Sequence, residues 1–199
     1  MAAKRFVRFS YNYFGGFSKL IEKQFSDIRD DLQRADMSYT LEEYLATAMA
    51  TSIITFVLET AILTFIFALF VNPFIAILSS LILSFAISAI IFFLFYSYPA
   101  TVARSRENKI NKVLPFAVSY MSSIASAKTT PLTLFKTLSR FKDYGEVAKE
   151  AENIVRDVEL FGMALSAAIR RRARRTPSEQ LKEVLYGMTT IISSGGDLD

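Results

Sequence analysis

The most concentrated chemistry in the sequence is an arginine run: the stretch IRRRARRTP, residues 169–177, holds five arginines in six consecutive positions. A guanidinium stays charged and offers a planar fork of N–H donors that matches carboxylate and phosphate oxygens. Projected as one helix over 158–175, the run separates into an apolar and a cationic face. Arg172 falls at the border, where its aliphatic stem can cover apolar surface. The cationic face consists of Arg170, Arg171, Arg174 and Arg175.

Several partners suit this cationic face: an acidic protein surface, anionic lipid headgroups, or the acidic helix that precedes it in the chain. Charge runs of this kind are also often no more than a solvated surface. Nucleic acid is disfavoured, because no aromatic residue interleaves the arginines and no reading module is recognisable. The acidic residues that could pair with the run inside the chain are Asp143, Glu146, Glu150, Glu152, Asp157 and Glu159.

The residue types needed for most catalysis are missing. The chain has 199 residues and contains neither His nor Cys. This removes imidazole bases, Ser-His-Asp triads and nearly every zinc or other transition-metal site. The glycines form no phosphate-binding loop between a strand and a helix. We therefore predict no catalytic, cofactor-binding or metal-binding residues, and a protein that is not an enzyme.

Charged residues almost vanish from the middle of the chain. Two apolar runs, 45–71 and 73–98, are separated by an Asn-Pro turn signal, and Glu59 is the sole charged side chain between Glu43 and Arg104. Each run exceeds the roughly 20 residues needed to cross a hydrocarbon core of about 30 Å. The pattern predicts a transmembrane helical hairpin. Basic flanks and an uncharged turn predict that both chain termini are cytoplasmic.

Glu59 lies inside the first predicted span, where a carboxylate costs roughly 2.5–3.5 kcal/mol on translocon scales. It should therefore face protein rather than lipid. Folding at the turn brings Glu59 to about the depth of Ser84, and we expect a serine hydroxyl to bond its carboxylate. Two stripes at four-residue spacing should face each other: Thr47, Thr51, Thr55 and Glu59 on the first span, and Ala76, Ser80, Ser84 and Ser88 on the second.

The remaining segments predict helices and no strands. An amphipathic helix is expected over 17–32. After the hairpin, helices are expected over 107–126, 131–141, 145–160, 163–175 and 177–194.

Local signals mark where these helices begin and end. Thr40 and Glu43 form a capping box before the first span. Two further helix starts are marked by proline at the first helical position. Thr130 is the expected N-cap before Pro131, and Thr176 is the expected N-cap before Pro177, with Glu179 completing a capping box. Glycines placed to end helices are Gly162, Gly195 and Gly196. The predicted fold is all-α, with a cytoplasmic N-terminal arm (1–43), a transmembrane helical hairpin (44–98) and a cytoplasmic antiparallel helical bundle (99–199).

The order of these features resembles the type II secretion F-domain family, the membrane platform proteins of type II secretion, type IV pili, tight-adherence pili and archaeal flagella. The order of two spans followed by the domain is most similar to the order in the archaeal and tight-adherence branches. Members continue into further spans, so the chain is expected to correspond to the N-terminal part of a platform. The matching features are Leu114-Pro115 opening the first helix, a small-residue turn before Pro131, Gly162 after RDVEL, Thr176-Pro177-Ser178, and SGGDL with Gly195-Gly196.

The resemblance implies a plasma-membrane scaffold without catalysis. On such platforms a hexameric secretion ATPase docks from the cytoplasm, and pilin-like or archaellin-like subunits pass from the lipid bilayer into a filament. Carried over, the bundle faces the ATPase, the hairpin anchors the chain, and the platform is a homo-oligomer. Two alternatives stay open: a fragment of a membrane transporter or channel, and a membrane-tethered binding protein that uses the arginine-rich helix.

Overall fold

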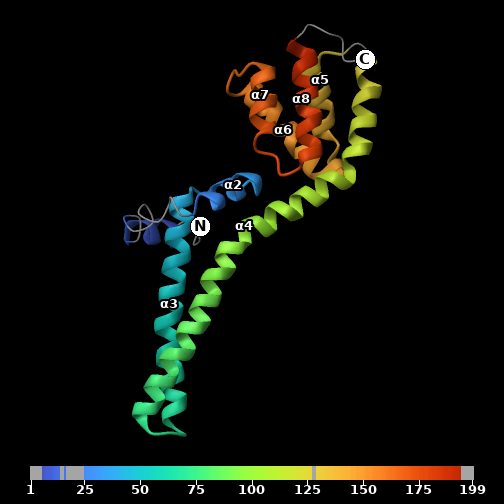
Figure 1. The fold of residues 1–199 in the computed structure, drawn as a ribbon. Coiled ribbons are helices and arrows are strands. Elements are labelled where there is room, and N and C mark those ends of the chain that lie inside the picture. Colours follow the sequence, from blue (N-terminus) through green and yellow to red (C-terminus); the bar gives the residue numbers. More distant parts are fainter. Residues whose placement is uncertain (1–5, 14–15, 17–24, 127–128, 194–199) are drawn as a thin grey trace. The chain divides into compact units, whose positions relative to one another are not determined.

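The computed structural model describes residues 6–13, 16, 25–126 and 129–193, and all regular elements in these ranges are helical (Figure 1). This confirms the predicted all-α class. Residues 6–13 are helical. The elements after them are α2 (Ser26–Arg34), α3 (Leu41–Ala68), α4 (Pro73–Ala125), α5 (Pro131–Arg140), the 3-10 turn η2 (Lys142–Tyr144), α6 (Gly145–Glu159), α7 (Leu165–Ala173) and α8 (Glu179–Ser193).

The chain divides into two compact units. The first comprises residues 1–32 and 37–101, and the second comprises residues 33–36 and 102–199. In the first unit, α2 is amphipathic and buries Ile28 and Leu32. This confirms the C-terminal part of the helix expected over 17–32, while residues 17–24 lie outside the described ranges.

Helix α3 begins as predicted. The Thr40 side chain accepts a hydrogen bond from the Glu43 N–H, and the Glu43 carboxylate accepts one from the Thr40 N–H. This capping box satisfies two backbone donors that the first turn leaves free. At the far end of the hairpin, the Asn72 side chain accepts from the Phe74 N–H at 3.0 Å, with Pro73 as the first residue of α4.

The apolar surface of this hairpin is mostly uncovered within its own unit. Helices α3 and α4 are each long and apolar enough to cross a membrane, and 11% of the most apolar stretch of each is buried. Large side chains such as Phe65 and Phe85 are about 70% exposed. Core helices of soluble proteins bury such residues, so this surface suits a hydrocarbon environment.

The small-residue stripe of α4 lies against α3 as predicted, but its hydrogen bonds reach Ser52 and Thr64 of α3 rather than the expected stripe of Thr47, Thr51, Thr55 and Glu59. Ala76, Ser80 and Ser84 are fully buried. The Ser88 hydroxyl donates to the Ser52 carbonyl at 2.9 Å, and the hydroxyls of Thr64 and Ser80 lie 2.6 Å apart. Small side chains allow this close approach of two apolar helices.

Helix α4 runs without a break from Pro73 to Ala125. The expectation of a span ending at 98 and a separate helix over 107–126 was therefore wrong. Pro99 lacks an N–H and leaves the carbonyl four residues earlier without its helical partner. That carbonyl, on Phe95, accepts a hydrogen bond from the Tyr44 hydroxyl at 2.7 Å. A side chain from α3 thus satisfies the group that would otherwise disfavour helix continuation.

The second unit is a helical bundle around one apolar core. Helix α5 packs on α6, α6 on α7 and α7 on α8. The core residues come from all four of these helices and from the C-terminal part of α4. They include Ile110 and Ala117 of α4, Leu134, Phe135 and Leu138 of α5, Ala151 and Ile154 of α6, Ala168 and Ile169 of α7, and Leu181 and Leu185 of α8.

Two of the predicted bundle boundaries are confirmed. Thr130 caps α5 by accepting from the Thr133 N–H, and Pro131 is the first helical residue. Gly162 follows α6 with φ at +64°, a left-handed conformation that glycine adopts at little cost. Its N–H donates to the Val158 carbonyl at 3.1 Å, which helps to satisfy the end of the helix.

Two other expectations are corrected. Helix α8 begins at Glu179, and its N-cap is Ser178 rather than Thr176, because the Ser178 hydroxyl accepts from the Leu181 N–H at 3.1 Å. Leu114 and Pro115 lie in the interior of α4 and open no helix. Leu114 is instead a buried core residue. Gly195 and Gly196 lie outside the described residues.

Candidate partner-binding site

Helix α7 carries most of the arginine run and has two unlike faces. Its nine residues bury Ala168, Ile169, Arg172 and Ala173. The helix projection over 158–175 was wrong in treating the segment as one helix, because residues 160–164 interrupt it after α6. The predicted separation into a buried and an exposed face is correct for α7 itself, since its buried residues recur three and four positions apart.

The outer face of α7 and the turn after it form an open, cationic hollow of about 400 Å³. Arg170, Arg171 and Arg174 are exposed and Arg175 is half-buried. The hollow is lined by these four residues together with Ala167 and with Gln33, which belongs to the same unit. The structure therefore brings together the four arginines of the predicted cationic face.

These arginines have few anionic neighbours. Arg171 pairs with Asp157 at 3.4 Å, and Arg170 contacts the Ser166 hydroxyl at 3.5 Å. Arg174 and Arg175 form no ion pair with any residue that the structure describes. Most of the positive charge of the hollow is thus available to an external anionic group.

Arg172 differs from the other arginines of the run, and its expected place at a helix border was wrong. It is 6% exposed. Its Nε donates to the Glu150 carboxylate, and its Nη2 donates to Asp36 Oδ1 at 3.2 Å. A guanidinium can be buried in this way because two carboxylates compensate its charge.

The Glu150 carboxylate joins two buried guanidinium groups. Glu150 is 2% exposed and also accepts from Arg106 Nη2 at 2.9 Å. Arg106 in turn donates to Glu146 Oε2 at 2.9 Å and to the Arg34 carbonyl at 2.6 Å. We call this group the ionic cluster: Asp36, Arg106, Glu146, Glu150 and Arg172.

The ionic cluster favours the charged forms of Glu146 and Arg172. Burial raises the pKa of the Glu146 carboxyl, but hydrogen bonds from Lys149 and Arg106 outweigh burial and bring the pKa below its ordinary value. Burial lowers the pKa of the Arg172 guanidinium, yet Glu150 and Asp36 raise it on balance. Glu146 and Arg172 are therefore ionised at neutral pH.

The ionic cluster was not anticipated from the sequence as a unit, although the acidic helix was expected to pair with the run. That pairing is confirmed for Glu150 and Asp157. A signal for burial was present in α6, because Glu150 lies among the apolar positions Val147, Ala151 and Ile154 at helical spacing. No comparable local signal marks Asp36, which is 136 residues from its partner.

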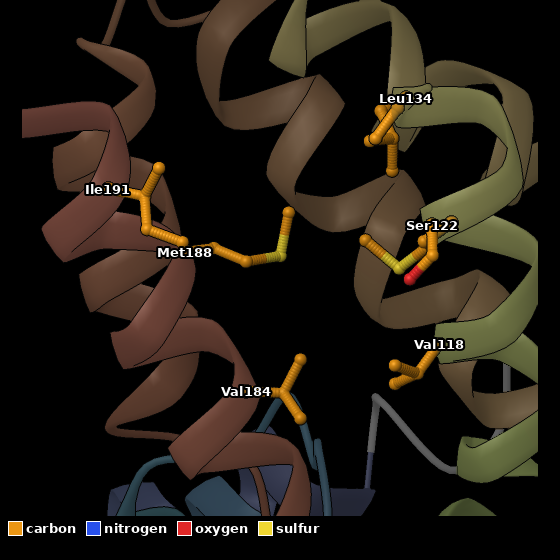
Figure 2. A pocket seen from close by; sticks show the side chains of 8 residues that line it. Val118, Ser122, Leu134, Val184, Met188 and Ile191 are labelled. Carbon is orange, nitrogen blue, oxygen red and sulfur yellow. The ribbon is translucent and has the colours of Figure 1, made fainter. Parts of the chain in front are cut away.

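A second concave feature of the bundle is an apolar groove of about 120 Å³. Figure 2 shows Met188, Val184 and Ile191 facing it from α8, with Val118 and Ser122 of α4 and Leu134 of α5 on the other side. The Ser122 hydroxyl is one of the few polar groups on its wall. The groove is small and offers no charged group that would orient a polar ligand.

Glu59 is half-buried within the hairpin, as expected for a carboxylate that avoids lipid. The contacts Ser52–Ser88 and Thr64–Ser80 bracket it, so the register brings Glu59 to the level of Ser84. The expected hydrogen bond between them is not formed. Glu59 Oε2 and Ser84 Oγ are both buried without a partner among the described residues.

Comparisons with known proteins bear on the bundle. A model of the type II secretion system protein F family matches residues 117–199. Flagella accessory protein J of Methanocaldococcus jannaschii is 30% identical over 102 residues, which are 51% of this chain and 18% of that protein. Two uncharacterised proteins of the same organism are 33% identical over 101 residues and 32% identical over 111 residues. These stretches are 51% and 56% of this chain, and 17% and 33% of the two relatives.

The matched stretch therefore spans at most about a third of the length of these relatives. No solved structure matches the chain.

Proposed function

We propose that the chain is part of a membrane platform for filament assembly, because residues 117–199 match the type II secretion system protein F family. The observation that supports the proposal is that the matched segment contains the whole outer face of α7. The cationic surface that could bind a partner therefore lies mostly within the part of the chain that matches the family. A relative is named as a flagella accessory protein, which favours an archaeal flagellum or a related pilus as the filament.

In this proposal the hairpin of α3 and α4 anchors the platform in the plasma membrane, and the bundle lies in the cytoplasm with both ends of the chain. The bundle receives a hexameric secretion ATPase. Pilin-like or archaellin-like subunits are assembled on the membrane side, and the platform acts as a homo-oligomer. The chain supplies binding surfaces and a mechanical link, and no catalytic residue is assigned to it.

The cationic hollow is the surface that we assign to the ATPase. Arginine is enriched where interfaces derive most of their binding energy, and complementary charge raises association rates. Arg174 and Arg175 have no ion pair with described residues, so an acidic partner would not have to displace an internal carboxylate from them. Lipid headgroups are the competing occupant, and charge reversal of the hollow distinguishes them from the ATPase.

The test replaces Arg170, Arg171, Arg174 and Arg175 together by glutamate in the 199-residue chain. Each replacement changes the charge by −2, so the net charge falls from +4 to −4. We expect loss of co-purification with the secretion ATPase of the same cells, while membrane insertion is retained.

A matched control makes the same change in net charge at exposed positions away from the hollow, namely Arg104, Lys109, Arg140 and Lys142. The control should retain the ATPase. Equal binding by both variants would refute the assignment of the hollow. If the hollow variant loses binding to vesicles that contain anionic lipid but keeps the ATPase, the occupant is the lipid headgroup.

A further inference from the structure

The turn that precedes the first membrane helix is held by buried arginines of the bundle. Residues 33–36 are the last two residues of α2 and the two that follow it, and they belong to the bundle unit. Arg172 holds the Asp36 side chain at 3.2 Å, and Arg106 holds the Arg34 carbonyl at 2.6 Å. Both guanidinium groups are themselves fixed by Glu150. The turn is therefore attached at a side chain and at the backbone.

The backbone of the turn shows that this attachment has a conformational consequence. Asp36 has φ at +57°, and no other described residue apart from glycine has positive φ. A left-handed conformation is unfavourable for most residues, and aspartate and asparagine tolerate it best. Such a conformation persists where the surroundings determine it, and here the Arg172 ion pair is the contact that holds the side chain.

The same turn contributes to the cationic hollow. Gln33 lines the hollow beside Arg170 and Arg174. Helix α7 thus touches the turn on two sides: its outer arginines share the hollow with Gln33, and its inner arginine holds Asp36. Any displacement of α7 acts on both contacts.

We propose that Arg172 is a positioning residue that couples the cationic hollow to the turn at residues 33–36, so that an acidic partner bound in the hollow restrains the chain leading into the first membrane helix. The inference rests on the proposed function of the hollow as the acidic partner's binding surface. It adds the route by which occupancy reaches a membrane segment: from α7, through the Arg172–Asp36 pair, to the turn five residues before α3 begins at Leu41.

The experiment measures amide hydrogen exchange of the 199-residue chain in detergent micelles, with Asp36→Asn as the variant. Asparagine keeps the size of the side chain and tolerates the left-handed backbone, so that only the charge is lost. The reporters are the amides of Asp36 and Met37, which are bonded to the Gln33 and Leu32 carbonyls at 3.1 and 3.0 Å. The matched control is Glu179→Gln, which removes the exposed Glu179–Lys182 pair.

Without any partner, Asp36→Asn should speed exchange at these two amides by up to about fivefold, the upper range for a partly exposed ion pair. The control should leave them unchanged. A rate equal to wild type in Asp36→Asn would overturn the proposed attachment, whatever the partner of the hollow is.

The coupling itself is measured by adding a decaglutamate peptide as the acidic probe. The probe should slow exchange at Asp36 and Met37 in wild type and in the control, and should have no such effect in Asp36→Asn although it binds there with comparable affinity. A similar slowing in Asp36→Asn refutes the coupling. If wild type binds the probe no more tightly than the variant with four glutamates in the hollow, the proposed function of the hollow fails, and the inference fails with it.

Discussion

Replacing Glu150 by glutamine removes one negative charge from between two buried guanidinium groups. Glu150 is 2% exposed, and Arg106 and Arg172 are 7% and 6% exposed. The amide has nearly the same shape as the carboxylate, so no cavity is created. The change therefore tests the electrostatic balance of the ionic cluster with little effect on packing.

The expected loss of stability follows from this burial. Removing one partner of a buried ion pair typically costs 3–5 kcal/mol, because the remaining charge is left without compensation. Here Glu146 still faces Arg106, and Asp36 still faces Arg172. These second carboxylates keep part of the compensation, so we expect the lower end of the range, about 3 kcal/mol.

Hydrogen exchange of the core amides of α6 and α7 measures this loss in the intact chain. A loss of about 3 kcal/mol corresponds to exchange that is about 100-fold faster for amides that open with the bundle. Glu179→Gln is the control, because its carboxylate is exposed and outside the cluster, and no change is expected there. Added salt should affect the result little, since buried charges are poorly screened.

Removing all the charges of the buried group should restore stability. Replacing Arg106, Glu150 and Arg172 together by Met, Leu and Met removes all three buried charges and should recover most of the lost stability. If Glu150→Gln leaves the protected amides unchanged, the cluster is not a compensated group of buried charges. If the triple replacement is less stable than Glu150→Gln, specific ionic geometry rather than charge balance maintains this region.

Tyr44→Phe leaves the Phe95 carbonyl without a donor at Pro99 and should lower the free energy of unfolding by about 1–3 kcal/mol, measured by thermal unfolding in detergent. Pro99→Ala restores the helical N–H, so Tyr44→Phe should cost much less in the Pro99→Ala background. An equal cost with and without Pro99→Ala contradicts the interpretation. The folded-state pKa of Glu146 lies below its ordinary 4.5, so its contribution to the free energy of unfolding is complete above pH 4.5 and is lost as the pH falls through the folded-state pKa. Glu146→Gln should therefore flatten the acid limb of a curve of stability against pH. An unchanged acid limb would show that this carboxyl does not control it.

Features that depend on neighbouring residues were predictable from the sequence. The capping box at Thr40 and the proline start at Pro131 each involve groups within four residues of one another. The left-handed glycine at Gly162 follows from a local rule on helix ends. The apolar runs of the hairpin are long enough to be identified by composition alone.

Features that depend on distant partners were not predictable. Proline normally predicts the end of a helix, yet α4 continues through Pro99, where Tyr44 from another helix donates to the freed carbonyl. Arg172 could not be distinguished from the other arginines of the run, since its burial depends on Asp36, far away in the sequence. In both cases a polar group is compensated by a residue that no local pattern connects to it.

The continuity of α4 also has a consequence for how this sequence can change by insertion. A single helix passes from the first unit into the second, so an insertion within it changes the helical phase of all residues that follow in α4. One residue inserted between Pro99 and Arg106 would turn the following part of α4 by about 100° about the helix axis and shift it by about 1.5 Å. Seven residues nearly restore the phase, since they make close to two full turns. A seven-residue insertion would therefore keep the side chains of α4 on nearly the same helical faces before and after it, whereas a single-residue insertion would not.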